Sequence, residues 1–181
     1  VRLAFEGDTT NFINTLTKLP LVHQPGRQFE YSFSTDVLGA VVEKVSGRRL
    51  GDQLQATVFG PLGMTDTTFR LTDAIKPRIA RPFKANPLDG KPQSIATIDK
   101  PTTFDCGGAC AMGTVGDYLR FGQMLMNGGE LDGKRILSPQ TVAHMTSNHL
   151  GPEIINRVGV VEPHREGFGF GLGVAVRTQA G

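Results

Sequence analysis

The sequence predicts an α+β fold that is mainly helical and ends in a strand. Apolar residues recur at helical spacing in residues 35–45 and again in 115–126, a pattern typical of helices with one buried face. In residues 168–176, phenylalanine, leucine and valine alternate with small or polar residues, as in a half-buried strand. A strand requires neighbours, so we expect residues 167–181 to begin an antiparallel sheet.

The first predicted helix is short and N-terminal. Thr9 or Thr10 is a suitable N-cap, Phe12 and Leu16 then share one face, and Pro20 ends the helix.

The second helix covers residues 35–45 and is the first with strong signals at both ends. Asp36 lies in its first turn, where a negative charge is favourable, and Gly47 supplies a left-handed stop. The residues expected to face inward are Val37, Leu38, Val41, Val42 and Val45. A third helix is predicted over 50–59.

The clearest helix begins after Thr114, which forms an approximate capping box with Asp117 and precedes a long apolar stripe. The residues of the stripe are Val115, Tyr118, Leu119, Gly122, Leu125 and Met126. Gly128 and Gly129 end this helix. Ser138 and Pro139 then predict the N-cap and first position of a last helix that reaches about Ser147.

Two long loops separate these elements. Residues 71–113 contain five prolines and no helical pattern, and either a functional surface or a solvated connector would fit this segment. Residues 151–166 form a shorter loop of the same kind. We therefore expect one truncated domain, with a helical region in 1–166 and the start of a sheet in 167–181.

Composition excludes several classes of protein. The net charge of +2 is small and dispersed, which does not favour a nucleic-acid partner. No apolar run is long enough to span a membrane. These 181 residues supply a core for one globular domain. The compartment stays open between cytoplasm and periplasm or secretion, because any signal peptide would precede this sequence.

Cys106 and Cys110 are the two cysteines of the chain. Their spacing would permit a small disulfide loop, two metal ligands or two unpaired thiols. A structural zinc site needs two more ligands, and no second cysteine pair exists. We expect two buried or half-buried thiols and no metal.

Tyr31 is the candidate functional residue. A Pro25-Gly26 turn precedes a short extended segment, and Tyr31 lies directly before a helix whose N-terminus carries partial positive charge. That setting favours a phenolate and suits a proton shuttle. The alternative is an aromatic side chain that fills the corner between loop and helix.

Three stretches in order resemble the serine β-lactamase and penicillin-binding-protein superfamily, specifically its class C and family VIII carboxylesterase branch. They are PGRQFEYSFSTDVLGAVVEKVSG (25–47), PLGMTDTTF (61–69) and GGACAMGTVGDYLRFGQMLMNGGELDGKRILSPQTVAHMTSNHL (107–150). The resemblance implies the β-lactamase/transpeptidase-like fold, of which this chain would be the mainly helical central region. It implies that Tyr31 works with a serine nucleophile and a lysine, without a cofactor.

Two motifs of that superfamily are missing from the chain. It contains no Ser-x-x-Lys, and the strings Thr15–Lys18 and Thr97–Lys100 are coincidental matches that begin with threonine. No Lys-Thr-Gly or equivalent follows the glycine-rich segment 167–173. We therefore expect the middle of a larger protein, inactive alone. Its sheet would be completed by further polypeptide or by a partner chain.

Phe33 is the residue from which we predict the class of substrate. β-Lactamases of this type usually carry asparagine two places after the tyrosine, where its amide binds the substrate's acylamino group. Phe33 has no donor or acceptor, and an apolar wall suits the acyl or alkyl group of an ester. We expect acyl transfer or ester hydrolysis through a serine ester. The alternatives are a β-lactamase or D-alanyl-D-alanine peptidase acting on a peptide-like substrate, and a non-catalytic binding or scaffold homologue.

Overall fold

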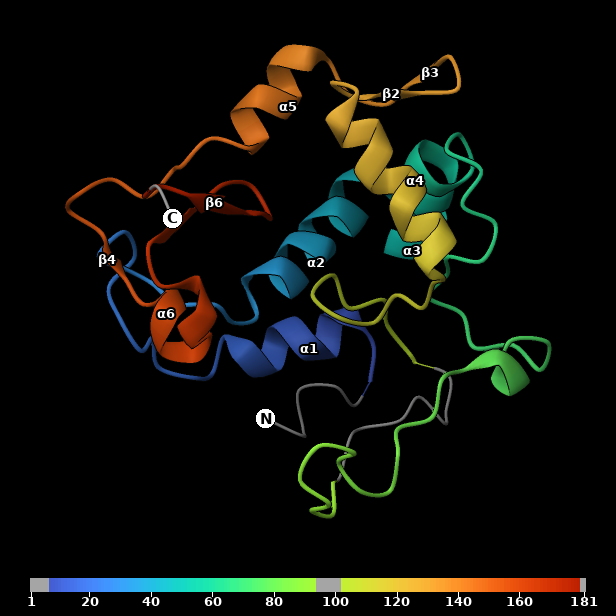
Figure 1. The fold of residues 1–181 in the computed structure, drawn as a ribbon, viewed down its shortest axis with the longest axis horizontal. Coiled ribbons are helices and arrows are strands. Elements are labelled where there is room, and N and C mark those ends of the chain that lie inside the picture. Colours follow the sequence, from blue (N-terminus) through green and yellow to red (C-terminus); the bar gives the residue numbers. More distant parts are fainter. Residues whose placement is uncertain (1–6, 94–101, 180–181) are drawn as a thin grey trace.

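The computed structural model describes residues 7–93 and 102–179 (Figure 1). It contains both helices and short strands, which confirms the predicted fold class. The α-helices are α1 (Thr9–Leu16), α2 (Ser34–Ser46), α3 (Leu50–Leu54), α4 (Val115–Met126), α5 (Pro139–Met145) and α6 (Val158–Val161). The turn η2 (Gln55–Phe59) is π-helical, and η3 (Lys76–Arg78) and η4 (Pro163–Arg165) are 3-10 turns.

The strands are short and pair two by two. The pairs are β1 (Gln28–Phe29) parallel to β4 (Ile155–Asn156), and β2 (Glu130–Leu131) antiparallel to β3 (Lys134–Arg135). The third pair is β5 (Phe168–Phe170) antiparallel to β6 (Ala175–Arg177).

The prediction of antiparallel strands near the C-terminus is confirmed, but the prediction of one continuous strand is corrected. Residues 168–176 do not form one strand, because the backbone reverses and the Gly171 N–H donates to the Val174 carbonyl at 2.8 Å. Gly173 has a φ of 85°, a conformation that glycine adopts without a steric penalty. The alternating apolar pattern therefore belongs to a hairpin, whose two strands pair with each other.

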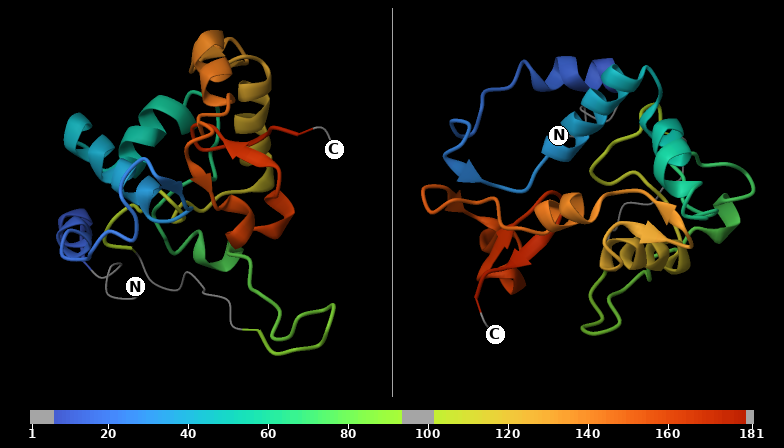
Figure 2. Two further views of the ribbon diagram at one scale, coloured as in Figure 1. Left: turned by 90° about the vertical axis from the view of Figure 1, so that its left-hand side faces the viewer. Right: turned by 90° about the horizontal axis from the view of Figure 1, so that it is seen from above.

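Helix α2 lies in the middle of the helical region and contacts α1 and α3 (Figure 1). Helix α5 lies between α4 and the β5–β6 hairpin in the right-hand view of Figure 2. Residues 80–93 project away from the body of the molecule.

Local signals fixed most helix ends as predicted. The Thr114 and Ser138 side chains accept hydrogen bonds from the Asp117 and Thr141 N–H groups, and Gly47 ends α2 with a φ of 67°. The first cap was predicted wrongly. Asp8 caps α1 by accepting from the Asn11 N–H at 2.9 Å.

The predicted third helix is not uniform. It is α-helical only to Leu54 and then widens into η2, where the Gly60 N–H donates to the Gln55 carbonyl five residues back.

Two clusters form the core of the described chain. The α3–α4 cluster consists of Leu50, Phe59, Leu62, Met64, Phe69 and Met124. The α1 cluster consists of Phe12, Phe104 and Cys106.

Most of the apolar stripe predicted for α4 does not face the core: Val115, Tyr118, Leu119 and Met126 are exposed. Of the stripe, Leu125 packs against the α3–α4 cluster, where α4 also buries Met124 and packs Phe121. Likewise, α2 exposes Val37, Leu38, Val41 and Val45, and of the residues expected to face inward only Val42 packs against the core. The helices were predicted correctly, but their buried faces were not.

The two loops contain more structure than their composition indicated. Within 71–113, Phe104, Asp105 and Cys106 are buried, so that part is not a solvated connector. The loop 151–166 contains β4, α6 and η4.

No helix in residues 7–93 and 102–179 is both long and apolar enough to cross a membrane.

Candidate functional site

Tyr31 lies in the segment that joins β1 to α2, two residues before the helix N-cap at Phe33. Its ring centroid is 6.0 Å from that of Phe170, and Phe29 lies 4.7 Å from the same ring. Tyr31 is 49% exposed. The β5–β6 hairpin thus supports one side of the tyrosine, while about half of its surface stays accessible.

The backbone before Tyr31 is held by β4. The Arg27 and Phe29 carbonyls accept hydrogen bonds from the Ile155 and Arg157 N–H groups at 3.1 and 3.0 Å. This parallel pairing fixes where the tyrosine segment leaves the strand. The pairing joins residues more than 120 positions apart and had no signal in the local sequence.

Phe33 is half-buried and forms part of the core. Its ring packs edge-on against Phe12 at 6.2 Å, beside the α1 cluster. Of the two candidate residues, Tyr31 is therefore accessible, whereas Phe33 packs in the core and helps to position the start of α2.

The segment 105–112 docks on the N-terminal part of α2. Asp36, which is buried, accepts a hydrogen bond from the Gly108 N–H at 3.0 Å. A methyl group at Gly107 would lie 2.4 Å from the Thr35 carbonyl oxygen, so only glycine permits this approach. The Asp36 carboxylate, predicted only to favour the helix dipole, also holds a distant loop.

A second buried carboxylate anchors the start of the same segment. Asp105 accepts from the Arg49 guanidinium at 2.5 Å and from the Gly51 N–H at 2.9 Å. The side chain of Asp105 is almost fully buried, whereas that of Arg49 is exposed on one side. A buried carboxylate requires such donors, and here they come from the start of α3.

A third carboxylate, Asp117, organises the segment before Phe69. It accepts from the Asp66 N–H and the Thr67 hydroxyl, both at 2.8 Å. At the surface, Arg78 pairs with Asp66 at 2.5 Å, and this hydrogen bond holds the pKa of the Asp66 carboxyl below its ordinary value.

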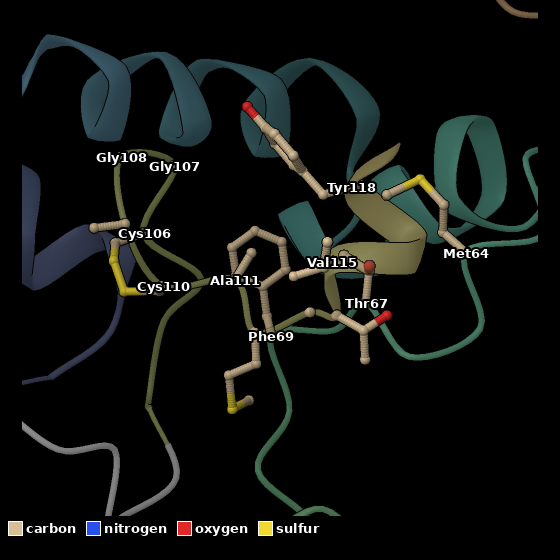
Figure 3. A pocket seen from close by; sticks show the side chains of 14 residues that line it. Met64, Thr67, Phe69, Cys106, Gly107, Gly108, Cys110, Ala111, Val115 and Tyr118 are labelled. Carbon is tan, nitrogen blue, oxygen red and sulfur yellow. A yellow bond between two sulfur atoms is a disulfide. The ribbon is translucent and has the colours of Figure 1, made fainter. Parts of the chain in front are cut away.

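Beside these contacts lies an open cavity of about 530 Å³ (Figure 3). Figure 3 shows the Gly107–Gly108 turn against α2 on one side, Met64 on the opposite side and Tyr118 between them. The walls are mainly apolar and include Met64, Phe69 and Val115. A cavity of this size and character fits an apolar group. Sequence reasoning missed it because its walls come from two stretches, 64–69 and 106–118, that lie far apart in the sequence.

The cysteine prediction was wrong. Cys106 and Cys110 form a disulfide with their Cα atoms 5.2 Å apart, which lies within the usual range. The bond closes the loop that forms one wall of the cavity.

The described residues contain no cluster of three His, Cys, Asp or Glu side chains that could hold a metal. The His144 and His149 rings do meet, with centroids 4.6 Å apart, and His149 Nε2 lies 2.8 Å from the His144 carbonyl oxygen.

The two threonine strings have different outcomes. Thr15 lies in α1 and its hydroxyl donates to the Asn11 carbonyl at 2.8 Å. The string Thr97–Lys100 lies outside the described residues.

Comparison with known proteins shows the family. The beta-lactamase family matches residues 4–181. An uncharacterized protein of Mycobacterium tuberculosis is 34% identical over 180 residues, which cover 98% of this chain and 45% of that protein. A lovastatin esterase of Penicillium rubens is 32% identical over 151 residues, covering 82% of this chain and 37% of the esterase.

The fold agrees with that of a solved hydrolase structure. EstCE1, described as a hydrolase with promiscuous acyltransferase activity, superposes with a TM-score of 0.70 at 27% identity, covering 97% of this chain and 47% of EstCE1. The chain thus spans less than half the length of each of these three proteins. With a family match over nearly its whole length and the fold to go with it, this chain belongs to the beta-lactamase family, in the superfamily of serine β-lactamases and penicillin-binding proteins that includes esterases.

Proposed function

We propose that the protein containing this chain hydrolyses esters, or transfers their acyl groups, through a covalent serine ester. The observation that carries the proposal is Tyr31, at the position that the family motif gives its tyrosine, half-exposed and held by Phe170. Relatives named as an esterase and as a hydrolase with acyltransferase activity support the choice of reaction.

In this mechanism Tyr31 moves a proton. A serine hydroxyl is a weak nucleophile at neutral pH and needs a base to take its proton. Tyr31 would accept or relay that proton during the attack and return one to the leaving group. The serine and its lysine would lie in sequence before Tyr31 that these 181 residues do not include.

The ester preference rests on Phe33. Because the Phe33 side chain has no amide, it offers no hydrogen bond to the acylamino group of a β-lactam or a peptide. Its packing against Phe12 adds a second effect, since it fixes the backbone two residues after Tyr31. We propose that Phe33 disfavours peptide-like substrates and maintains an apolar surface next to the tyrosine.

The decisive experiment measures turnover of p-nitrophenyl butyrate and of nitrocefin by the full-length protein and its Tyr31→Phe variant. We expect ester turnover that exceeds nitrocefin turnover, and a loss of about 10²–10⁴-fold in kcat on removal of the hydroxyl. Tyr118→Phe is the matched control, because Tyr118 is the other tyrosine of the chain and is also exposed.

The outcomes separate the alternatives. Nitrocefin turnover that exceeds ester turnover would identify a β-lactamase, and no turnover of either reagent would favour a non-catalytic homologue. Equal activity of Tyr31→Phe and the wild type would remove Tyr31 from the mechanism.

A further inference from the structure

The Cys106–Cys110 disulfide lies where the two core clusters meet. Cys106 belongs to the α1 cluster and is 1% exposed. Cys110 is half-buried and packs against both the α1 cluster and the α3–α4 cluster. The bond is therefore a covalent link at the junction of two otherwise separate groups of buried side chains.

The loop that the bond closes is held firmly at both ends. At one end Asp105 bonds to Arg49 and Gly51. At the other end Met112 and Thr68 exchange two backbone hydrogen bonds of 2.8 and 2.9 Å.

Between these anchors the loop is held by the disulfide and by its docking against α2. The docking contacts are the hydrogen bond from the Gly108 N–H to Asp36 and the close approach of Gly107 to Thr35, and a long backbone bond of 3.4 Å runs from the Cys110 N–H to the Cys106 carbonyl. The disulfide is thus the strongest constraint on the middle of this loop. Its loss would free residues 106–111 while leaving the two anchors in place.

The two sulfur atoms differ in access. Cys106 is enclosed by Phe12 and Phe104, so an external thiol cannot reach its sulfur without local opening. Both cysteines border the 530 Å³ cavity, but Cys110 is partly exposed and also borders a smaller cavity beside Phe69 and Leu71. Attack on the disulfide is therefore expected at Cys110.

We propose that this disulfide is a redox-sensitive cross-link that couples the α1 cluster to the α3–α4 cluster and fixes one wall of the cavity. A thiolate of a small dithiol attacks Cys110 Sγ, the S–S bond breaks, and its electron pair leaves on Cys106 Sγ, which takes up a proton. The second thiol of the reductant then displaces the Cys110 thiolate, which is also protonated. The chain gains two electrons and two protons, and the dithiol becomes a cyclic disulfide. This proposal does not depend on the esterase activity.

The test uses the full-length protein purified without reductant, with alkylation by iodoacetamide, peptide mass spectrometry and hydrogen exchange. Without dithiothreitol, both cysteines should stay unlabelled, and with it both should be labelled. On reduction, the amides of 106–111 and of α1 should exchange about tenfold faster, because the loop closure no longer restrains local opening. The exchange of α5, which contributes no residue to either cluster, should not change.

Cys110→Ser is the control variant, since it leaves Cys106 in its buried position and removes the bond. It should show the faster exchange without reductant and no response to dithiothreitol. If that variant does not fold, titration of the wild type with a trialkylphosphine provides the second measurement.

Two results would overturn the proposal. Labelling of both cysteines in untreated protein would mean that the bond does not form. Reduction that leaves the exchange of α1 unchanged, whether or not 106–111 responds, would mean that the bond does not couple the clusters.

Discussion

Three buried aspartates connect parts of the chain that are far apart in sequence. Each carboxylate accepts a hydrogen bond from a backbone N–H of another segment. The carboxylate and the N–H thus each have a partner in the protein in place of water. The pairs are Asp36 with Gly108, Asp105 with Gly51, and Asp117 with Asp66. The sequence identified two of these residues, but only for local roles: Asp36 as a favourable charge in the first turn of a helix, and Asp117 as part of an approximate capping box. Their partners lie 51 to 72 residues away and left no local signal.

Asp117→Ala tests how much one such connection contributes to the free energy of unfolding. The change leaves the Asp66 N–H and the Thr67 hydroxyl without their acceptor, so the free energy of unfolding should fall by about 1–3 kcal/mol. Urea denaturation measures it. Asp52→Ala is the control, because Asp52 pairs with Arg70 at the surface and its loss should cost about 0–1 kcal/mol. Equal losses for the two variants would contradict the role of the buried carboxylate.

At the scale of secondary-structure elements, the helix ends were predictable and the buried faces were not. Thr114, Ser138 and Gly47 act within one turn of their own position, so sequence is sufficient to identify them. Which face of α4 is buried depends on what packs against it. The sequence predicted one apolar stripe, but the α3–α4 cluster covers the side of α4 that contains Met124.

Two glycines with open space around them should respond in opposite directions to alanine. Gly47 has a φ of 67°, so Gly47→Ala should lower the free energy of unfolding by about 1 kcal/mol. Gly122 lies inside α4 with no atom near the added methyl group, so Gly122→Ala should raise it by up to about 1 kcal/mol. Thermal denaturation compares the two, and the same sign for both would refute this assignment of their backbone conformations.

Two methionines of α4 test which face is buried. Met124 is fully buried and Met126 is 83% exposed. Met124→Ala should cost about 2–5 kcal/mol, because it leaves a cavity in the α3–α4 cluster. Met126→Ala should change stability by less than about 0.5 kcal/mol. A large loss for Met126→Ala in chemical denaturation would show that this face is covered in the protein.

At the scale of the whole molecule, the segment 104–112 joins the α1 cluster to the α3–α4 cluster. It supplies Phe104 and Cys106 to the first cluster, places Cys110 between both, and borders the 530 Å³ cavity. A proline-rich stretch without periodicity gave no indication of this role. Its importance comes from the contacts it makes with α2 and α3.

Gly107→Ala tests this docking. The added methyl group would lie 2.4 Å from the Thr35 carbonyl oxygen, so the loop and α2 must separate, at a cost of about 1–3 kcal/mol. Ala109→Ser, an exposed change in the same loop, is the control and should stay within about 0.5 kcal/mol. Differential scanning calorimetry of both variants measures the effect. Unchanged stability of Gly107→Ala would mean that this close approach is absent.

The sequence by itself determined the fold class, most helix ends and the family, and Tyr31 as the candidate proton carrier is a proposal that rests on it. These depend on residue types within a few positions of each other, such as a threonine before a helix or a tyrosine in a family motif. The tertiary structure decided the disulfide, the buried faces of α2 and α4, the core role of Phe33 and the cavity. Each of these depends on which distant segments share space, because burial, bond formation and the walls of a cavity are properties of the packed chain.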